Sequence, residues 1–176
     1  MSQLGEMPND EFDAFFVVDT DICIESFAGG IDADNRISGF QEACDAVDGL
    51  TARTLAVQKG DSILDAAISE IMAQDNPPTA LCFHQDSQAI PLFFLLQRSG
   101  LSVPGDISVT GFDDSTFAKE AELTTVRQRP YDMAVDAAQK ALALIEGQPI
   151  EEPFETFPVQ LQVRNSTAKP RTAPLL

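Results

Sequence analysis

The 176-residue chain is 44% hydrophobic, which is typical of a globular domain with a core of its own and excludes an intrinsically disordered protein. It has 28 acidic and 11 basic residues, a formal net charge of −17. Because proteins neutralise nucleic-acid phosphates with lysine and arginine, we expect no DNA binding by this chain alone. No apolar run approaches the roughly 20 residues that cross a bilayer, and the acidic N-terminus lacks a signal-peptide pattern, which predicts a cytoplasmic protein without membrane contact.

Residue types that bind metals or perform catalysis form no recognisable pattern in the sequence. The three cysteines, Cys23, Cys44 and Cys82, are far apart and odd in number, which is typical of buried small side chains rather than of disulfides or a zinc site. His84 is the single histidine, and no partner ligands accompany it. Without a nucleophile–base pair, a metal cluster or a phosphate-binding loop, the sequence predicts neither an enzyme nor a cofactor or metal site.

The first part of the chain is predicted to alternate helices and strands, because apolar residues recur at helical spacing in some segments and form short runs in others. The predicted elements are a short amphipathic helix over 8–18, a strand over 22–27 that ends in a Gly29–Gly30 loop, a helix over 36–47, a strand over 51–57 and, after a turn at 60–62, a helix over 63–72. The first of these helices is predicted from four apolar residues, Phe12, Phe15, Phe16 and Val18.

The middle of the chain continues the alternation. Residues 79–83 form a continuous apolar run, typical of a strand inside a parallel sheet, and a helix follows from Asp86 or Ser87 to Gly100. Residues 106–112 include a short β-branched run bounded by glycine, which favours another strand. Short connections between helices and apolar strands are typical of an α/β fold with a doubly wound parallel sheet.

Polar residues follow three of the predicted strands, at 29–36, 84–86 and 113–114. Ligands of open parallel sheets bind beyond the carboxyl ends of the strands, so we expect these segments to meet in a pocket at one edge of the sheet. The adjacent residues Asp113 and Asp114 leave two interpretations open. Aspartates at this position either contact a ligand or cap the turn that follows.

The last part of the chain changes character. The predicted elements are an extended segment over 123–128, a helix over 131–146, a proline-punctuated connection over 149–158, a strand over 159–163 and a loose end over 167–176. Pro130 suits the first turn of the helix and Gly147 its end. The alternating side chains of the last strand predict that it is half-buried.

Four segments of the chain are distinctive when taken together: VPGDISVTGFDD, LTTVRQRPYDMAVDAAQKALALIEGQ and PVQLQVRNST in its last part, and AGGIDADNRISGFQEA earlier. These segments resemble the LacI/GalR family of bacterial transcription regulators, the first three being similar to its C-terminal portion and the fourth to an earlier segment. Their order and spacing match from about residue 9 to residue 167. The resemblance implies one lobe of a periplasmic-binding-protein-like effector domain plus a tail helix and strand. Such a domain senses a small molecule, a sugar or a nucleoside, for a regulator that binds DNA through another part.

The resemblance also implies which residues contact the ligand. The position of Arg36 donates hydrogen bonds and the position of Asp113 accepts them, which suits sugar hydroxyls because these do both. Without the resemblance, the position of Arg36 in the sequence favours a surface residue at the start of a helix over a ligand contact. The resemblance reverses this preference. Gln85 stands where the family usually has an asparagine, and it keeps the amide but reaches one methylene farther. Ser62 follows Gly60–Asp61 where the family often has an aromatic that stacks on the sugar, so that platform is absent or supplied elsewhere.

The family pattern further divides the chain. Residues 9–122 correspond to the second lobe, 123–167 to a crossover, helix and strand normally shared with the first lobe, and 168–176 to a loose C-terminus. The helix-turn-helix and the first lobe have no counterpart in this sequence. Because the tail helix then has no sheet to cover, we expect a homodimer formed by tail exchange, or a tail folded back onto the remaining lobe. The alternative function is a truncated interaction module, which oligomerises with itself or with full-length relatives.

Overall fold

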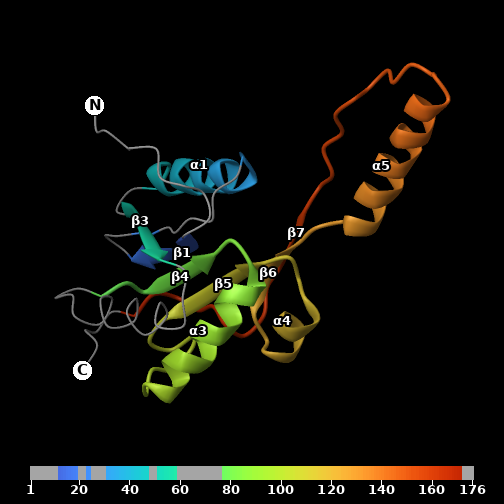
Figure 1. Ribbon diagram of the computed structural model, residues 1–176. Coiled ribbons are helices and arrows are strands. Elements are labelled where there is room, and N and C mark those ends of the chain that lie inside the picture. Colours follow the sequence, from blue (N-terminus) through green and yellow to red (C-terminus); the bar gives the residue numbers. More distant parts are fainter. Residues whose placement is uncertain (1–11, 20–22, 25–30, 48–50, 59–76, 172–176) are drawn as a thin grey trace.

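The structure is a computed structural model that describes residues 12–19, 23–24, 31–47, 51–58 and 77–171. These residues form a seven-stranded sheet with helices on both sides (Figure 1). The elements in chain order are β1 Phe12–Asp19, β2 Cys23–Ile24, α1 Ile31–Asp45, β3 Thr51–Gln58, β4 Ala80–Phe83, α3 Asp86–Arg98, β5 Ser108–Phe112, α4 Thr116–Glu120, β6 Thr124–Arg127, α5 Pro130–Ile145 and β7 Gln160–Gln162. None of the helices in these ranges is long and apolar enough to cross a membrane.

The sheet confirms the predicted α/β class but is mixed rather than parallel throughout. Its strand order is β2-β3-β1-β4-β5-β6-β7. Strands β4, β5 and β6 are parallel, whereas β1 is antiparallel to β3 and β4, and β7 is antiparallel to β6. The parallel pairing of β4 with β5 places Cys82 opposite Thr110. The residues that follow these two strands are therefore neighbours at one edge of the sheet.

Strand β1 corrects the helix predicted over residues 8–18. It pairs along its whole length with β3, from Phe12 opposite Gln58 to Asp19 opposite Thr51. A short run with few apolar residues fits the helical period and the strand period equally, and phenylalanine and valine favour strands. Pairing with a distant segment therefore decides the structure, and a local pattern contains no information about that pairing.

Most other predicted elements match the structure within a few residues. Helix α1 begins at Ile31 instead of Arg36, and β3, β4, α3 and β5 occupy the segments predicted for them. Of the strand predicted over 22–27, the structure describes β2. The Gly29–Gly30 loop and the helix predicted over 63–72 lie outside the described residues.

The core lies where β4 and β5 pack against α3. Leu81 and Val109 on the strands and Leu92 and Leu96 on the helix are almost completely buried. The helix residues are four apart and therefore lie on one face. Burying each such side chain stabilises the fold by about 1.5–3 kcal/mol. This cluster therefore fixes the strand ends where the ligand residues were predicted.

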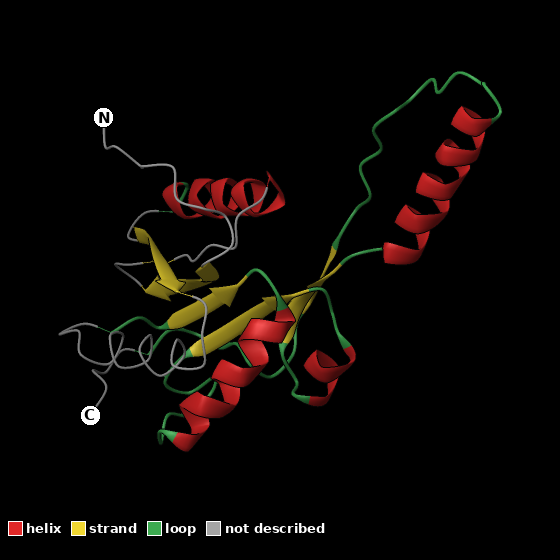
Figure 2. Ribbon diagram, viewed as in Figure 1, coloured by secondary structure: helices red, strands yellow, loops and turns green. Residues whose placement is uncertain are grey.

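Residues 128–159 form an arm that projects from the end of the sheet and contains α5 (Figures 1 and 2). As predicted, Pro130 occupies the first turn of α5, and Gly147, with a φ of 72°, follows its end. None of the residues of α5 is buried. The predicted half-buried strand, β7, is also mostly exposed, because it is the last strand of the sheet and pairs with β6.

Residues 167–171 are anchored, in contrast to the loose end predicted for residues 167–176, and the rest of that end lies outside the described residues. Ser166 is fully buried, and its hydroxyl donates a hydrogen bond to the carbonyl oxygen of Val109 over 2.6 Å. Farther along, Arg171 donates to the carbonyl oxygen of Pro78 over 2.8 Å. The chain is therefore tied to the sheet as far as Arg171, beyond which the structure is not described.

Candidate ligand-binding site

Arg36 lies at the carboxyl edge of the parallel strands. It projects from α1, and its Nη1 donates a hydrogen bond over 2.9 Å to the carbonyl oxygen of His84, which follows β4. Its guanidinium carbon lies 4.0 Å from the centroid of the ring of Phe112, the last residue of β5. A guanidinium at this distance is attracted to the aromatic face. Arg36 is thus fixed between two strand ends, and since a guanidinium has five N–H donors, this anchoring leaves donors for a ligand.

Asp113 follows β5 directly and lies at the same edge. Its Oδ1 accepts a hydrogen bond from Nε2 of Gln128 over 2.7 Å, and its backbone N–H donates to the carbonyl oxygen of Val126 over 2.8 Å. The pKa of the Asp113 carboxyl is raised because the fold removes water from it, although the Gln128 hydrogen bond and the positive charge of Arg36 act in the opposite direction. The structure therefore places Asp113 where the positive charge of Arg36 acts on it.

Gln85 lies between β4 and α3, also at this edge. It occupies the N-cap position of α3 with extended backbone, φ −149° and ψ 141°, but its side chain does not cap the helix. Its Oε1 accepts a hydrogen bond from Oγ of Ser87 over 3.1 Å. None of the contacts within the described part of the chain joins Gln85 to Arg36 or Asp113. Gln85 therefore remains a separate candidate at the edge.

Asp86 connects the start of α3 to the turn after β5 and to β6. The sequence had suggested that Asp86 or Ser87 caps the helix. It is buried, its Oδ1 accepts a hydrogen bond from Oγ1 of Thr125 over 2.6 Å, and its Oδ2 accepts one from the backbone N–H of Ser115 over 2.7 Å. Its close approach to β5 requires Gly111, because a Cβ there would lie 2.2 Å from Oδ1. Asp86 thus connects the start of α3 to the turn after β5.

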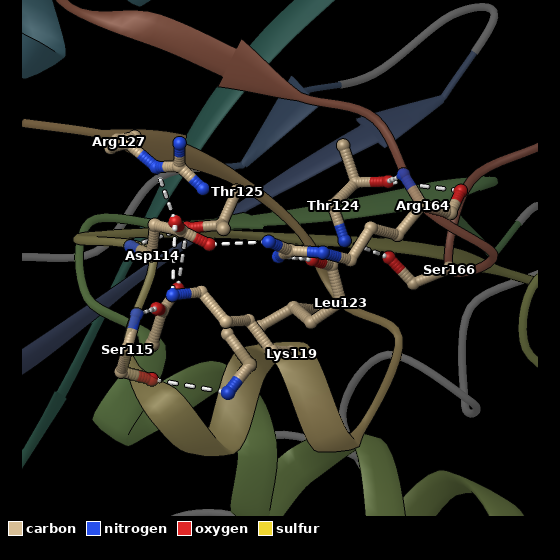
Figure 3. Close-up of polar contacts among 11 residues, drawn as sticks. Asp114, Ser115, Lys119, Leu123, Thr124, Thr125, Arg127, Arg164 and Ser166 are labelled. Atoms are coloured by element: carbon tan, nitrogen blue, oxygen red, sulfur yellow. Dashed lines mark hydrogen bonds and ion pairs between the residues drawn. The ribbon is translucent and has the colours of Figure 1, made fainter.

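Asp114 is the centre of an ion-pair cluster (Figure 3). Its side chain is 2% exposed, its Oδ2 accepts a hydrogen bond from Nε of Arg127 over 2.5 Å and lies 3.8 Å from Nζ of Lys119, and its Oδ1 pairs with Arg164. Burial acts to raise the pKa of Asp114, but the hydrogen bonds and charges of Arg164 and Arg127 outweigh it and lower the pKa. The cap of α4 is Ser115. Asp114 therefore has a structural role, and Asp113 is the exposed aspartate of the two.

The residues that support this edge were only partly visible in the sequence. Arg127 and Gln128 are the last two residues of the extended segment predicted over 123–128, and the end of a strand is a position that marks candidate ligand residues in such folds. Phe112 and Arg164 carry no comparable signal, because their partners are distant in sequence or lie on another element. A cavity of about 400 Å³ lies elsewhere, at the base of the arm, and none of the three candidate ligand residues lines it.

Two of the cysteines agree with the prediction of inert packing residues. Cys44 is buried and Cys82 is half-buried, and neither forms a disulfide within the described part of the chain. Burial raises the pKa of the Cys82 thiol to about 11. At neutral pH this thiol therefore stays protonated, and a protonated thiol is a poor nucleophile and metal ligand.

Comparison with known proteins identifies the domain type. Residues 20–167 match the family model of the periplasmic binding protein-like domain. The chain is 34% identical over 144 residues to the HTH-type transcriptional regulator GalR of Escherichia coli, a match that covers 79% of this chain and 42% of that regulator. The chain therefore spans less than half the length of this relative.

Solved structures of LacI-family regulators share the fold, as two examples show. A LacI transcriptional regulator from a Rhodococcus species superimposes with a TM-score of 0.69 at 28% identity, over 84% of this chain and 56% of that one. A LacI family regulator from Enterococcus faecium, solved with bound ribose, gives a TM-score of 0.70 at 25% identity, over 86% and 58%. The fold, the domain match and the similarity to GalR agree with the resemblance seen in the sequence. The chain belongs to the LacI/GalR family of transcription regulators and matches part of their periplasmic-binding-protein-like effector region.

Proposed function

We propose that this chain senses a small molecule for a LacI/GalR regulator and binds a sugar or a nucleoside at the edge formed by Arg36 and Asp113. The observation that carries the proposal is a fixed guanidinium beside a carboxylate, at the carboxyl ends of two neighbouring parallel strands. Ligands of open α/β sheets bind at this edge. The ribose bound to the Enterococcus faecium regulator supports a sugar as the ligand class.

The two charged groups complement a sugar hydroxyl. Arg36 offers only hydrogen-bond donors, and ionised Asp113 offers only acceptors. A hydroxyl group does both, so a ligand with neighbouring hydroxyls satisfies both residues at once. Hydrogen bonds to ionised groups are roughly twice as strong as neutral ones. Gln85 adds an amide at the same edge, which both donates and accepts.

The affinity is expected to be weak, with a Kd of about 1 mM. Small-molecule sites usually enclose about 70–90% of the ligand surface, whereas Asp113 is exposed. The chain also spans little more than half the length of its solved relatives. Its net charge of −17 supports the further proposal that this chain does not itself bind DNA.

Saturation-transfer NMR with D-ribose, D-galactose and adenosine tests the proposal, because it detects weak binding. Arg36→Ala and Asp113→Asn are expected to weaken binding by about tenfold, since each removes a charge-assisted hydrogen bond. The control variants Arg98→Ala and Asp45→Asn change exposed residues at the C-terminal ends of α3 and α1 and are expected to bind like the parent. The proposal is wrong if the parent binds none of the three compounds, or if the Arg36 and Asp113 variants bind as well as the controls.

We also propose that the chain forms homodimers through the arm. This corresponds to the alternative function predicted from the sequence, an interaction module that oligomerises with itself. Large apolar side chains of α5 face solvent, among them Tyr131, Leu144 and Ile145, the last being 81% exposed. Large apolar side chains exposed together on one helix are typical of interaction sites in soluble proteins. A second copy of the chain presents the same surface, and self-complementary contacts of this type form twofold dimers.

Light scattering coupled to gel filtration tests self-association over a range of concentrations. We expect the parent to be a dimer and the variant Leu144→Glu with Ile145→Glu to be a monomer, because two buried carboxylates would oppose the contact. The control variant Val47→Glu with Phe117→Glu changes exposed apolar residues outside the arm and should stay dimeric. A parent that is monomeric at every concentration contradicts this proposal and leaves the ligand proposal untouched.

A further inference from the structure

We infer that Gln128 is a positioning residue of the proposed ligand site: its amide occupies Oδ1 of Asp113 and leaves Oδ2 to accept a hydrogen bond from the ligand. The inference rests on the proposed function, because it assigns Gln128 a role in that site. Gln128 directly follows β6 and is 15 residues from Asp113 in sequence, and its Nε2 donates to Oδ1 over 2.7 Å. The described residues include no hydrogen-bond partner for Oδ2 of Asp113.

The backbone around Asp113 is held from the same strand. The N–H of Asp113 donates to the carbonyl oxygen of Val126 over 2.8 Å. Asp113 and Asp114 have φ angles of 109° and 53°, values in the left-handed region that residues with a Cβ seldom adopt. The backbone contact therefore fixes the position of the turn but not the side-chain rotamer of an exposed aspartate. The amide of Gln128 selects that rotamer.

A neutral donor is suited to this position. The charged groups that act on Asp113 are Arg36 from α1 and Asp86 from the start of α3. Because an amide carries no charge, it satisfies one carboxylate oxygen without pairing away the negative charge. The second oxygen therefore keeps the strength of a charged acceptor toward a ligand hydroxyl. A lysine in place of Gln128 would neutralise the carboxylate instead.

Two measurements on the full chain test the inference, with Gln128→Ala as the variant and Gln97→Ala, an exposed residue of α3, as the matched control. The first is the pH titration of the Asp113 carboxyl carbon by NMR without any sugar. We expect a higher pKa for Asp113 in Gln128→Ala than in the parent, because the Gln128 hydrogen bond favours the ionised form. The second is the affinity for D-ribose, which we expect to fall by about tenfold in Gln128→Ala.

The two measurements separate this inference from the proposed function. If the Asp113 titration is the same in the parent and in Gln128→Ala, the positioning role is wrong whatever the sugar result. If the titration moves but the parent binds no ribose, the contact is supported and the proposed function is contradicted for this probe. If the titration moves and ribose affinity is unchanged in Gln128→Ala, Gln128 does not position the carboxylate for the ligand.

Discussion

At the scale of single residues, the ion pairs of Asp114 join β6 and the segment after β7 to the turn after β5. Asp114→Ala leaves Arg164, which is 15% exposed, without this carboxylate. Removing one partner of a buried ion pair costs about 3–5 kcal/mol, and because Arg127 is 44% exposed, we expect a loss in unfolding free energy of about 3 kcal/mol, measured by urea denaturation. Asp136→Ala, which removes the pair with Lys140 within α5, should cost much less, because water screens an ion pair on an exposed helix. Equal losses of unfolding free energy in the two variants would contradict the structural role of the Asp114 ion pairs.

The same carboxylate predicts how stability depends on pH. Because the pKa of Asp114 is lowered from its usual 3.8, its contribution is fully present above that value and is lost as the pH falls through the pKa of the folded state. The contribution of Asp113 to stability changes with pH in the opposite direction. Because its pKa is raised, its ionised form is unfavourable in the folded state at neutral pH, and protonation removes that cost. Urea unfolding at several pH values should show a steeper acid loss in the parent than in Asp114→Asn. Parallel curves would contradict this prediction.

The sequence predicted the neighbourhood of Arg36 and Asp113 but not the division of roles between Asp113 and Asp114. Both aspartates follow the same strand, and turn preference alone treats them alike. The structure separates them through left-handed backbone angles and through Arg164, which is 50 residues from Asp114 in sequence. The ligand roles of Arg36, Gln85 and Asp113 stay predictions.

At the scale of elements, β5 approaches the start of α3 so closely that only glycine fits at Gly111. A Cβ there would lie 2.2 Å from Oδ1 of Asp86 and 2.9 Å from Cδ2 of Leu123, which are both buried. Overpacking costs about 1–3 kcal/mol, and we expect Gly111→Ala to lose about 3 kcal/mol in thermal unfolding, because Asp86 has hydrogen bonds to lose. Gly39→Ala on α1, where a Cβ meets nothing within 4 Å, should be neutral or stabilise by up to about 1 kcal/mol. A neutral Gly111→Ala would contradict the packing described.

Elements with long apolar patterns were predictable and short ones were not. Helices α3 and α5 have clear helical spacing and recognisable ends, so their predicted bounds were close to the observed ones. The segment of β1 was too short to distinguish the two periods. Helix α4 has five residues, which is little more than one turn, and was not predicted. The C-terminal segment was predicted to be loose because its anchors, Ser166 and Arg171, bind distant backbone carbonyls that no local pattern reveals.

At the scale of the whole molecule, the chain combines a packed lobe with an exposed arm. The lobe has a buried core around β4, β5 and α3, whereas α5 has no buried residue. The predicted division into 9–122, 123–167 and 168–176 stays a prediction, although the last segment is tied to the sheet through Arg171. Packing and family resemblance could predict the lobe. A surface that packs on the arm in a dimer, as proposed above, could not be predicted from the apolar pattern of one chain.

The central claim is that the edge between Arg36 and Asp113 binds the ligand, and mapping of amide chemical shifts during a D-ribose titration tests it most directly. The account predicts that the largest changes occur at His84, Gln85 and Asp113, which surround this edge, and that they saturate together. Changes confined to the cavity at the base of the arm, around Gln160, or no saturable change anywhere in the chain, would contradict it.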